Sequence, residues 1–193
     1  MKKLVLGMFV SLDGFVATTS GDNSWIFEHG DDAVDNWIVG HLNETSYHVM
    51  GSQTFLATAS YWPNATDSFA APMNNIPKFV FSKKGIHNID GFKIDEASDK
   101  GSWANPYVGD DLPATINKLK QEEGKPLRSI GGVGFAHSLI AADLVDEYNL
   151  LVCPVALGSG LPLFPVLDKP KKLTLVNSVK FKTGAMAHTY RRG

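Results

Sequence analysis

Runs of consecutive apolar residues mark the strands of this chain. Residues 3–10 carry mostly apolar side chains at successive rather than alternate positions, which is typical of a strand covered on both faces at the centre of a sheet. Shorter runs of the same kind occupy residues 47–50, 78–82 and 127–130. Each run ends at glycine, serine or another small polar residue, so we predict that the chain leaves the sheet at those points.

Two segments have apolar residues at helical spacing. In the first, Asp31 or Asp32 is the candidate N-cap, and the apolar face comprises Val34, Trp37, Ile38 and Leu42. In the second, Asp110 or Asp111 is the candidate N-cap and Gly124 the candidate stop. Its apolar face comprises Leu112, Ile116 and Leu119. Both segments therefore predict helices that pack one face on a sheet.

The order of elements predicts an α/β fold. A short helix around residues 135–140 follows a glycine-rich turn, and residues 146–157, 173–181 and 185–191 predict three more strands. Alternating strands and helices favour parallel pairs made by right-handed crossovers, whereas the last two strands, joined near Thr183-Gly184, must form an antiparallel hairpin. We therefore expect one domain over residues 1–193, with a mixed, mostly parallel central sheet flanked by helices.

The segment between residues 56 and 77 contains three prolines and predicts at most a short helix. Compact domains rarely keep so long a connection without a function. We therefore consider it a candidate for a loop that closes over a ligand.

Composition excludes several classes of protein. The chain has 193 residues, with 18 Lys and Arg against 20 Asp and Glu, and a formal net charge of −2. No basic run is present, so a dedicated nucleic-acid-binding protein is not expected. The single cysteine, Cys153, leaves no CxxC pair and favours a reducing compartment.

The amino terminus resembles a signal peptide only in part. Lys2 and Lys3 precede an apolar run, but Asp13 interrupts it early and no cleavage site follows. No other run has the length of a membrane helix. We predict a soluble cytoplasmic protein without a membrane partner, and a bacterial-type signal is the less favoured alternative.

Candidate chemistry is concentrated directly after the predicted strands. The residues there are rich in glycine, hydroxyl groups and lysine: Ser11 and Asp13, Gly51 to Thr54, Ser82 and Lys83, and Gly131 to Gly134. Ligands of open α/β sheets bind at the carboxyl ends of strands, and bare amides with glycine suit a phosphate group. However, each group is equally typical of a tight turn, and neither GxGxxG nor GxxxxGK[ST] is present. Spacing and composition alone leave both interpretations open.

Several longer motifs carry a family resemblance. They are Ser11-Leu12-Asp13-Gly14-Phe15-Val16-Ala17, Val49-Met50-Gly51-Ser52-Gln53-Thr54-Phe55, Tyr61-Trp62-Pro63, Ser129-Ile130-Gly131-Gly132, Leu144-Val145-Asp146-Glu147, Pro154-Val155-Ala156-Leu157-Gly158-Ser159-Gly160 and Leu163-Phe164. Together they resemble the dihydrofolate reductase-like superfamily, and within it the RibD C-terminal domain, the reductase half of a bifunctional riboflavin-synthesis enzyme. The motifs occur in family order and span nearly the whole chain.

The resemblance implies a three-layer fold with a mixed eight-stranded sheet, an NADPH cofactor and a homodimer. It implies hydride transfer to a pyrimidine or pterin-type substrate, most like 5-amino-6-(5-phosphoribosylamino)uracil. The alternatives are dihydrofolate reductase activity and a catalytically silent nucleotide-binding domain of the same fold. A deaminase half is not expected, because the chain lacks a zinc-deaminase HxE with PCxxC.

The resemblance also implies where the coenzyme binds. Val10 and Ser11 are expected at the nicotinamide, and Ser82 and Lys83 at the adenosine end. The pyrophosphate is expected between two groups, the first being Gly51, Ser52 and Thr54 and the second Gly131, Gly132, Val133, Gly134 and Phe135. The family usually has Arg where this chain has Ser52, and Ser cannot supply that charge. Lys83 or Lys84 is the candidate partner of the 2′-phosphate, and NADPH is retained over NADH.

Reduction also needs a proton. Asp13 is the first candidate donor if burial raises its pKa, and its alternative role is an ordinary turn acid that bonds the backbone. Dihydrofolate reductases carry an acid on the first helix, a few residues after a Trp. Trp25 matches that Trp, but the acids that follow are out of clear register, and Asp32 is the second candidate. The missing match argues against dihydrofolate as substrate.

Three aromatic residues, Trp25, Phe55 and Trp62, are candidates to stack on a planar substrate, and core packing is the alternative role for each. The six histidines show no ligand spacing, so no metal is predicted.

Overall fold

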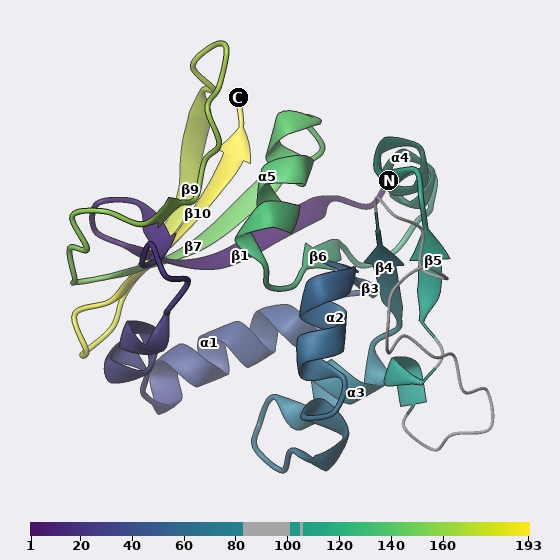
Figure 1. Ribbon diagram of the computed structural model, residues 1–193, viewed down its shortest axis with the longest axis horizontal. Coiled ribbons are helices and arrows are strands. Elements are labelled where there is room, and N and C mark those ends of the chain that lie inside the picture. Colours follow the sequence, from purple (N-terminus) through teal and green to yellow (C-terminus); the bar gives the residue numbers. More distant parts are fainter. Residues whose placement is uncertain (83–100, 105) are drawn as a thin grey trace.

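An eight-stranded mixed sheet forms the centre of the protein (Figure 1). The structure is a computed structural model that describes residues 1–82, 101–104 and 106–193. The strands are β1 (Leu4–Ser11), β3 (Tyr47–Gly51), β4 (Lys78–Phe81), β5 (Tyr107–Gly109), β6 (Leu127–Ser129), β7 (Glu147–Cys153), β9 (Leu173–Lys180) and β10 (Met186–Arg192). Their order is β5-β4-β3-β6-β1-β7-β10-β9. All neighbours are parallel except β10, which is antiparallel to both β7 and β9.

A second, two-stranded sheet joins the loop after β1 to the loop after β7. It consists of β2 (Phe15–Ala17) and β8 (Leu161–Pro162), which are antiparallel. A side chain at Gly160 would collide with the carbonyl of Ala17, so the close approach requires glycine there. The sequence predicts only a sharp connection here, because strands of two or three residues show no periodicity.

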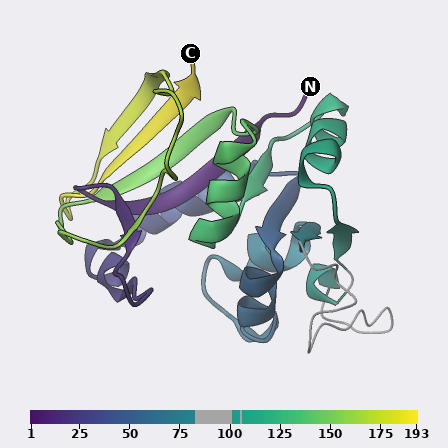
Figure 2. The same cartoon turned by 45° about the horizontal axis from the view of Figure 1, so that its top comes forward.

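Helices cover both faces of the large sheet. They are α1 (Asp32–Asn43), α2 (Ser52–Thr58), α3 (Ala70–Asn75), α4 (Leu112–Gln121) and α5 (Val133–Ala141), with 3₁₀ turns at Ser24–His29, Trp62–Asn64 and Gly101–Trp103. Helices α4 and α5 pack on one face, and α1 and α3 pack on the other. Figure 2 shows α5 and α1 on opposite sides of the sheet. The three-layer α/β fold is therefore confirmed.

The predicted N-caps are present. Asp31 caps α1, because its Oδ1 accepts a hydrogen bond of 2.8 Å from the Val34 amide. Asp111 caps α4, because its Oδ1 accepts a hydrogen bond of 2.9 Å from the Ala114 amide. The prediction that α4 stops at Gly124 is wrong: the helix ends at Gln121, and Gly124, with φ of +126°, lies in the turn beyond.

Alternation along the strands divides the core into two layers. Leu4, Leu6 and Leu127 face α4 and α5, whereas Leu151 packs against Val34 of α1. The strand predicted over residues 146–157 ends at Cys153, directly before Pro154, which has no amide to donate to a ladder.

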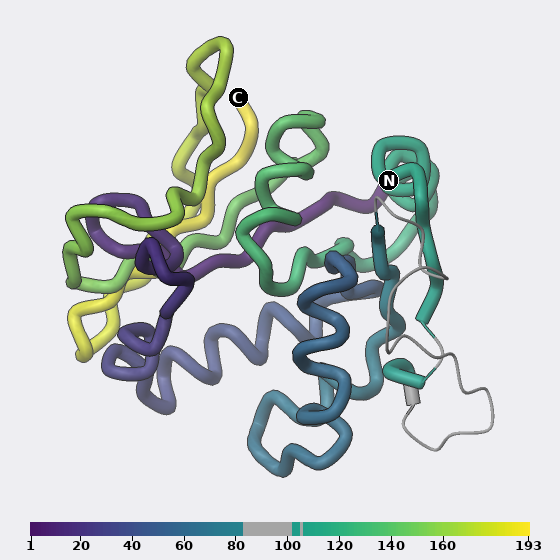
Figure 3. The backbone as a smooth tube through the Cα atoms, viewed as in Figure 1, coloured from purple at the N-terminus to yellow at the C-terminus, as the bar shows by residue number. Residues whose placement is uncertain are grey.

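The carboxyl ends of β1, β3, β4, β6 and β7 lie along one edge of the sheet, which we call the carboxyl edge; the opposite side is the amino edge. Helix α1 leads from the end of β1 to the start of β3, so it begins at the carboxyl edge and ends at the amino edge. The tube in Figure 3 shows this return of the chain beneath the sheet. Within the described residues, no helix is long and apolar enough to cross a membrane.

Candidate functional site at the carboxyl edge

A glycine pair leads from β6 into α5. Gly131 and Gly132 have φ of +61° and +60°, a conformation that favours glycine. A Cβ would lie 2.7 Å from the Thr54 side chain at either position, so no larger residue fits. Helix α5 has Gly132 as its N-cap, and no side chain of the described residues caps it. Its first amides therefore remain available to an anion such as a phosphate.

Helix α2 begins beside this pair. Gly51 ends β3 and is the N-cap of α2, again without a capping side chain among the described residues. A Cβ on Gly51 would touch the Phe135 side chain at 3.4 Å, and Thr54 lies against Gly131. The structure thus brings together both groups of residues that the sequence predicts at the pyrophosphate, although Ser52 adds no positive charge there.

Strand β1 has a partly open side at the carboxyl edge. It pairs with β6 only from Leu4 to Leu6, whereas it pairs with β7 as far as Ser11. Beyond Leu6, the backbone groups that face β6 have passed the end of that strand, which stops at Ser129. Amides and carbonyls at such an edge are suited to bind a carboxamide group. This supports the predicted place of Ser11 beside a nicotinamide. The backbone of Val10 faces β7, so its predicted contact stays a prediction.

Asp13 does not have the environment of a proton donor. Its carboxylate accepts hydrogen bonds from Ser11 Oγ at 2.6 Å, Gly158 N at 2.7 Å and Leu157 N at 3.1 Å. These bonds, that of Ser11 foremost, lower the pKa of Asp13, and the side chain is exposed. The condition set for catalysis, a pKa raised by burial, is not met. Asp13 instead ties the loop after β1 to the loop after β7.

An acid that the sequence analysis did not single out, Asp35, has the opposite shift. Burial raises its pKa, and the negative charges of Asp32, Asp31 and Asp67 raise it further. Asp35 lies on the first half of α1, near the carboxyl edge, and Asp67 lies in the segment that leads into α3. Asp32, the second predicted donor, is exposed in the first turn of α1. In the sequence, the signal that could have identified Asp35 was its position next to Val34, at the margin of the apolar face of the helix.

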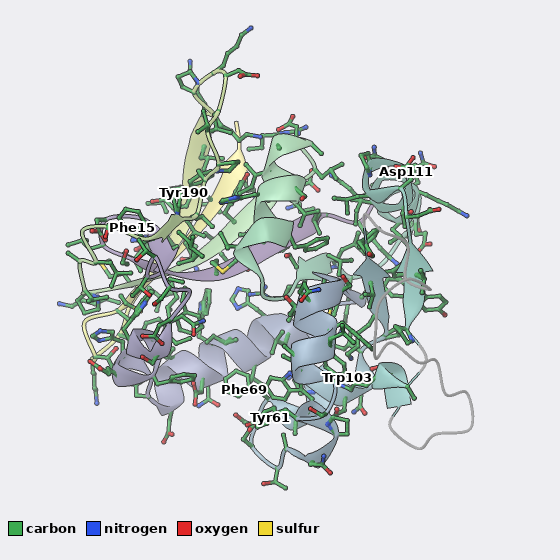
Figure 4. All side chains as sticks on the ribbon, viewed as in Figure 1. Phe15, Tyr61, Phe69, Trp103, Asp111 and Tyr190 are labelled. Atoms are coloured by element: carbon green, nitrogen blue, oxygen red, sulfur yellow. The ribbon has the colours of Figure 1, made fainter. Side chains whose placement is uncertain are left out.

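The three predicted stacking residues have different surroundings. Phe55 is buried, with its ring centroid 5.5 Å from that of Trp103, so it packs in the core. Trp25 is also buried, and its indole Nε1 has no hydrogen-bond partner among the described residues. Trp62 is half-buried and packs edge-on against Tyr61, with centroids 5.0 Å apart. Figure 4 shows Tyr61 and Phe69 in the segment between α2 and α3, near α1.

The remaining predicted positions lie at the end of β4. Ser82 directly follows that strand and is half-buried. Lys83 and Lys84 lie outside the described residues, so their predicted contact with the adenosine end stays a prediction. No group of three His, Cys, Asp or Glu side chains suited to a metal occurs within the ranges given above.

Comparison with known proteins identifies the family. The family model described as the RibD C-terminal domain matches residues 2–187. The chain belongs to the RibD C-terminal domain family. This confirms the resemblance seen in the sequence, and RibD C-terminal domains typically act as NADPH-dependent reductases.

Individual relatives of this RibD C-terminal domain agree with that result. Uncharacterized protein YyaP of Bacillus subtilis (strain 168) is 27% identical over 194 residues, which cover 98% of this chain and 94% of YyaP. A protein of Shewanella sp. PV-4, provisionally assigned to riboflavin biosynthesis, has a TM-score of 0.74 at 22% identity, with 99% of each chain covered. Dihydrofolate reductase from Enterococcus faecalis, solved with NADP(H), has a TM-score of 0.59 at 14% identity and covers 99% of this chain and 96% of its own. The two structures show the shared fold.

The residues of this RibD C-terminal domain fit the pyrophosphate of a dinucleotide coenzyme. The fit rests on the glycine pair, where a Cβ would fill the space beside Thr54, and on the uncapped start of α5. Gly131, Gly132 and the amides that follow would hold the pyrophosphate, with Gly51 and Thr54 on the other side. The open side of β1 would hold the nicotinamide.

Proposed function

We propose that this protein is an NADPH-dependent reductase that transfers a hydride to a pyrimidine or pterin-type substrate, most like 5-amino-6-(5-phosphoribosylamino)uracil. One observation carries the proposal: the glycine pair, the uncapped start of α5 and the open side of β1 lie at the same edge of the sheet. That edge is where open α/β sheets bind nucleotides. The family assignment supports the choice of NADPH.

The protein's own residues position the coenzyme and provide the proton. The coenzyme would carry the hydride, which goes to the electrophilic carbon of the substrate. In the ring-opened imine form of the ribosylamino group, the hydride adds to the carbon of the C=N bond and the nitrogen takes up a proton. Asp35 is the proposed source, because its raised pKa keeps it protonated at higher pH than an ordinary Asp. The backbone edge of β1 would fix the ring that donates the hydride.

Helix α1 favours a pyrimidine over dihydrofolate. The residue it directs at the sheet beside Leu151 is Val34, which is completely buried. Dihydrofolate reductases carry an acid on this helix a few residues after a Trp, whereas the acids that follow Trp25 are out of clear register. Dihydrofolate reductase activity is therefore the less supported alternative.

The first test measures coenzyme binding with matched glycine variants. Gly132→Ala introduces a Cβ at φ of +60° next to Thr54 and blocks the proposed pyrophosphate cradle. We expect NADPH affinity, followed by fluorescence titration, to fall at least about tenfold. Gly124→Ala is the control, because it places Ala at a positive φ at the amino edge. Equal loss in both variants would mean that strain alone, and not the cradle, weakens binding.

The second test measures turnover. NADPH oxidation is followed by absorbance with 5-amino-6-(5-phosphoribosylamino)uracil and, separately, with dihydrofolate. Oxidation with the uracil derivative supports the proposal, and oxidation only with dihydrofolate favours the alternative. Tight NADPH binding without NADPH oxidation in the presence of either substrate would indicate a catalytically silent nucleotide-binding domain. NADH in a parallel titration tests whether this chain, with Ser52, still prefers the 2′-phosphate. The homodimer and the cytoplasmic location stay predictions.

A further inference from the structure

A recess opens at the amino edge, on the other side of the molecule from the proposed coenzyme site. It lies between the second half of α1 and the amino-terminal parts of β1, β6 and β7, and its volume is about 510 Å³. This is within the range of small-molecule sites, roughly 300 to 1,000 Å³. We call it the Arg128 recess after the charged residue in its wall.

Arg128 is a buried cation without a carboxylate partner. Its side chain projects from the middle of β6, and the residue is 5% exposed. Nη1 donates a hydrogen bond of 3.0 Å to Asn149 Oδ1. Nε and Nη2 have no hydrogen-bond partner, and no carboxylate lies within 4.0 Å, among the residues that the structure describes. Since a buried, unpaired charge is costly, such an arrangement calls for an anion.

The acids beside Arg128 are already neutralised by other cations. Glu147 Oε2 lies 3.0 Å from Arg191 Nε and 3.6 Å from Lys3 Nζ. Glu44, at the rim, lies 3.6 Å from Lys125 Nζ. Glu147 lines the recess and its charge also favours the charged form of Arg128. With Arg128, Arg191 and Lys3 around this one carboxylate, the surroundings of Arg128 keep a net positive charge. A cationic ligand is disfavoured and an anionic one favoured.

Gly7 makes room for the guanidinium. It lies on β1, between β6 and β7, and a Cβ at this position would collide with Nη2 of Arg128. Gly7 has no positive φ, so its backbone conformation does not require glycine. The absence of a side chain instead lets Arg128 extend across β1 to Asn149. Glycine at position 7 thus leaves space for the guanidinium of Arg128 beside β1.

An aromatic pair forms the outer wall. Trp37 and His41 lie one turn apart on α1, with ring centroids 4.2 Å apart. Burial lowers the pKa of His41, which favours its neutral form, and its Nδ1 is bonded to the Trp37 carbonyl at 2.8 Å. The two rings are inclined at 42° to each other, so the pair presents two apolar ring surfaces to the recess. A guanidinium fork on one side and aromatic rings on the other suit a carboxylate with a planar apolar body.

We propose that the Arg128 recess is a second ligand site, which binds a small carboxylate carrying a flat apolar group. Its carboxylate would accept hydrogen bonds from the free donors of Arg128, and its apolar part would lie against Trp37 and His41. The site is separate from the coenzyme edge, so it stands whether or not the proposed reductase activity does.

The test uses sodium benzoate as the probe and benzamide as its uncharged analogue. Each is titrated into the full chain by calorimetry at constant ionic strength, up to about 10 mM, which nearly saturates a site with a Kd of about 1 mM. We expect saturable binding of benzoate and at least about tenfold weaker binding of benzamide. No saturable heat with benzoate, or equal affinity for both probes, would overturn the proposal.

Three variants assign the binding to Arg128. Arg128→Met removes the charge, and Gly7→Ala displaces Nη2 but keeps the charge; we expect each to weaken benzoate binding at least about tenfold. Arg192→Met is the control. It also removes one positive charge from the protein, but Arg192 is paired with Asp143 and does not line the recess. It should bind benzoate like the wild type. If Arg128→Met does not fold, Gly7→Ala decides. Benzoate affinity unchanged in the folded variants, or lost equally in Arg192→Met, contradicts the site.

Discussion

Two carboxyl groups near the carboxyl edge have opposite pKa shifts, and their surroundings explain both. Asp13 accepts three hydrogen bonds to its charged form, which lower its pKa. Asp35 is partly removed from water and lies near three other acids, which raises its pKa. Asp13 was predicted near the site from the sequence, and Asp35 was not. Ser11 acts on Asp13, and Asp32 and Asp31 act on Asp35, from nearby positions in the chain, but both shifts also depend on contacts across the fold, from Leu157, Gly158 and Asp67. Local spacing contains no information on these contacts.

Asp35→Asn tests the proposed proton source. We expect kcat for the reducible substrate to fall at least about 100-fold, the usual contribution of a general acid. The same variant should be more stable at pH values where Asp35 is ionised, because the ionised side chain repels Asp31 one turn away, a pair worth about 0.2 to 0.5 kcal/mol. Steady-state kinetics and thermal melting measure the two effects.

Asp67→Asn is the matched control for that variant. It removes a negative charge that raises the pKa of Asp35, but keeps the acid itself. Turnover should persist, and the alkaline limb of its pH profile should move to lower pH. If Asp35→Asn retains turnover, or the profile does not move in Asp67→Asn, Asp35 does not donate the proton.

Longer elements follow from the sequence, and of the strands with two or three residues only β6 does. The apolar run of β1 and the capped face of α1 are long enough for periodicity to identify them. Strands β2, β5 and β8 have two or three residues each, and pairing with distant segments decides their structure. Arg128 was missed for a related reason. It lies within a three-residue strand, and only the neighbouring strand shows that Gly7 accommodates it.

Two neighbouring acids at the start of α1 can be distinguished by substitution: Asp31, the N-cap, and Asp32, the second predicted proton donor. Asp31→Ala removes the hydrogen bond to the Val34 amide, and we expect the free energy of unfolding to fall by about 1 kcal/mol. Asp32→Ala removes an exposed acid from the first turn, where its interaction with the helix dipole is worth only about 0.3 to 1 kcal/mol. Urea denaturation compares the two. Loss of turnover in Asp32→Ala, with folding intact, would restore Asp32 as a donor.

Across the whole sheet, three basic residues lie side by side on the face that packs against α1 and α3. Lys78, His48 and Arg128 are register neighbours on β4, β3 and β6, and all are buried. Lys78 is satisfied by the carbonyls of Met73 and Ile76 and by Ser102 Oγ, although burial lowers its pKa to about 7. Burial lowers the pKa of Arg128 to about 10.

This row makes stability depend on pH through His48. Burial, and the charges of Lys78 and Arg128, hold its pKa well below 6.5 in the folded state. Between that low value and 6.5 the unfolded chain binds the extra proton, so stability rises with pH there and is lost on acidification. We expect His48→Gln to flatten this slope, by up to about 1.4 kcal/mol per pH unit. Urea denaturation at several pH values below 6.5 measures it, and parallel curves for both proteins would contradict the assignment.

The reactivity of Cys153, the single cysteine of the chain, can report local opening of the sheet. Cys153 is fully buried at the end of β7, in register with Ser11 of β1, and desolvation raises its pKa to about 11. Alkylation of the native protein by iodoacetamide must therefore wait for the strands to separate, and its rate reports the population of opened molecules. NADPH bound along β1 should slow the reaction in proportion to occupancy. Labelling as rapid as that of an unfolded chain would show that this part of the core opens freely.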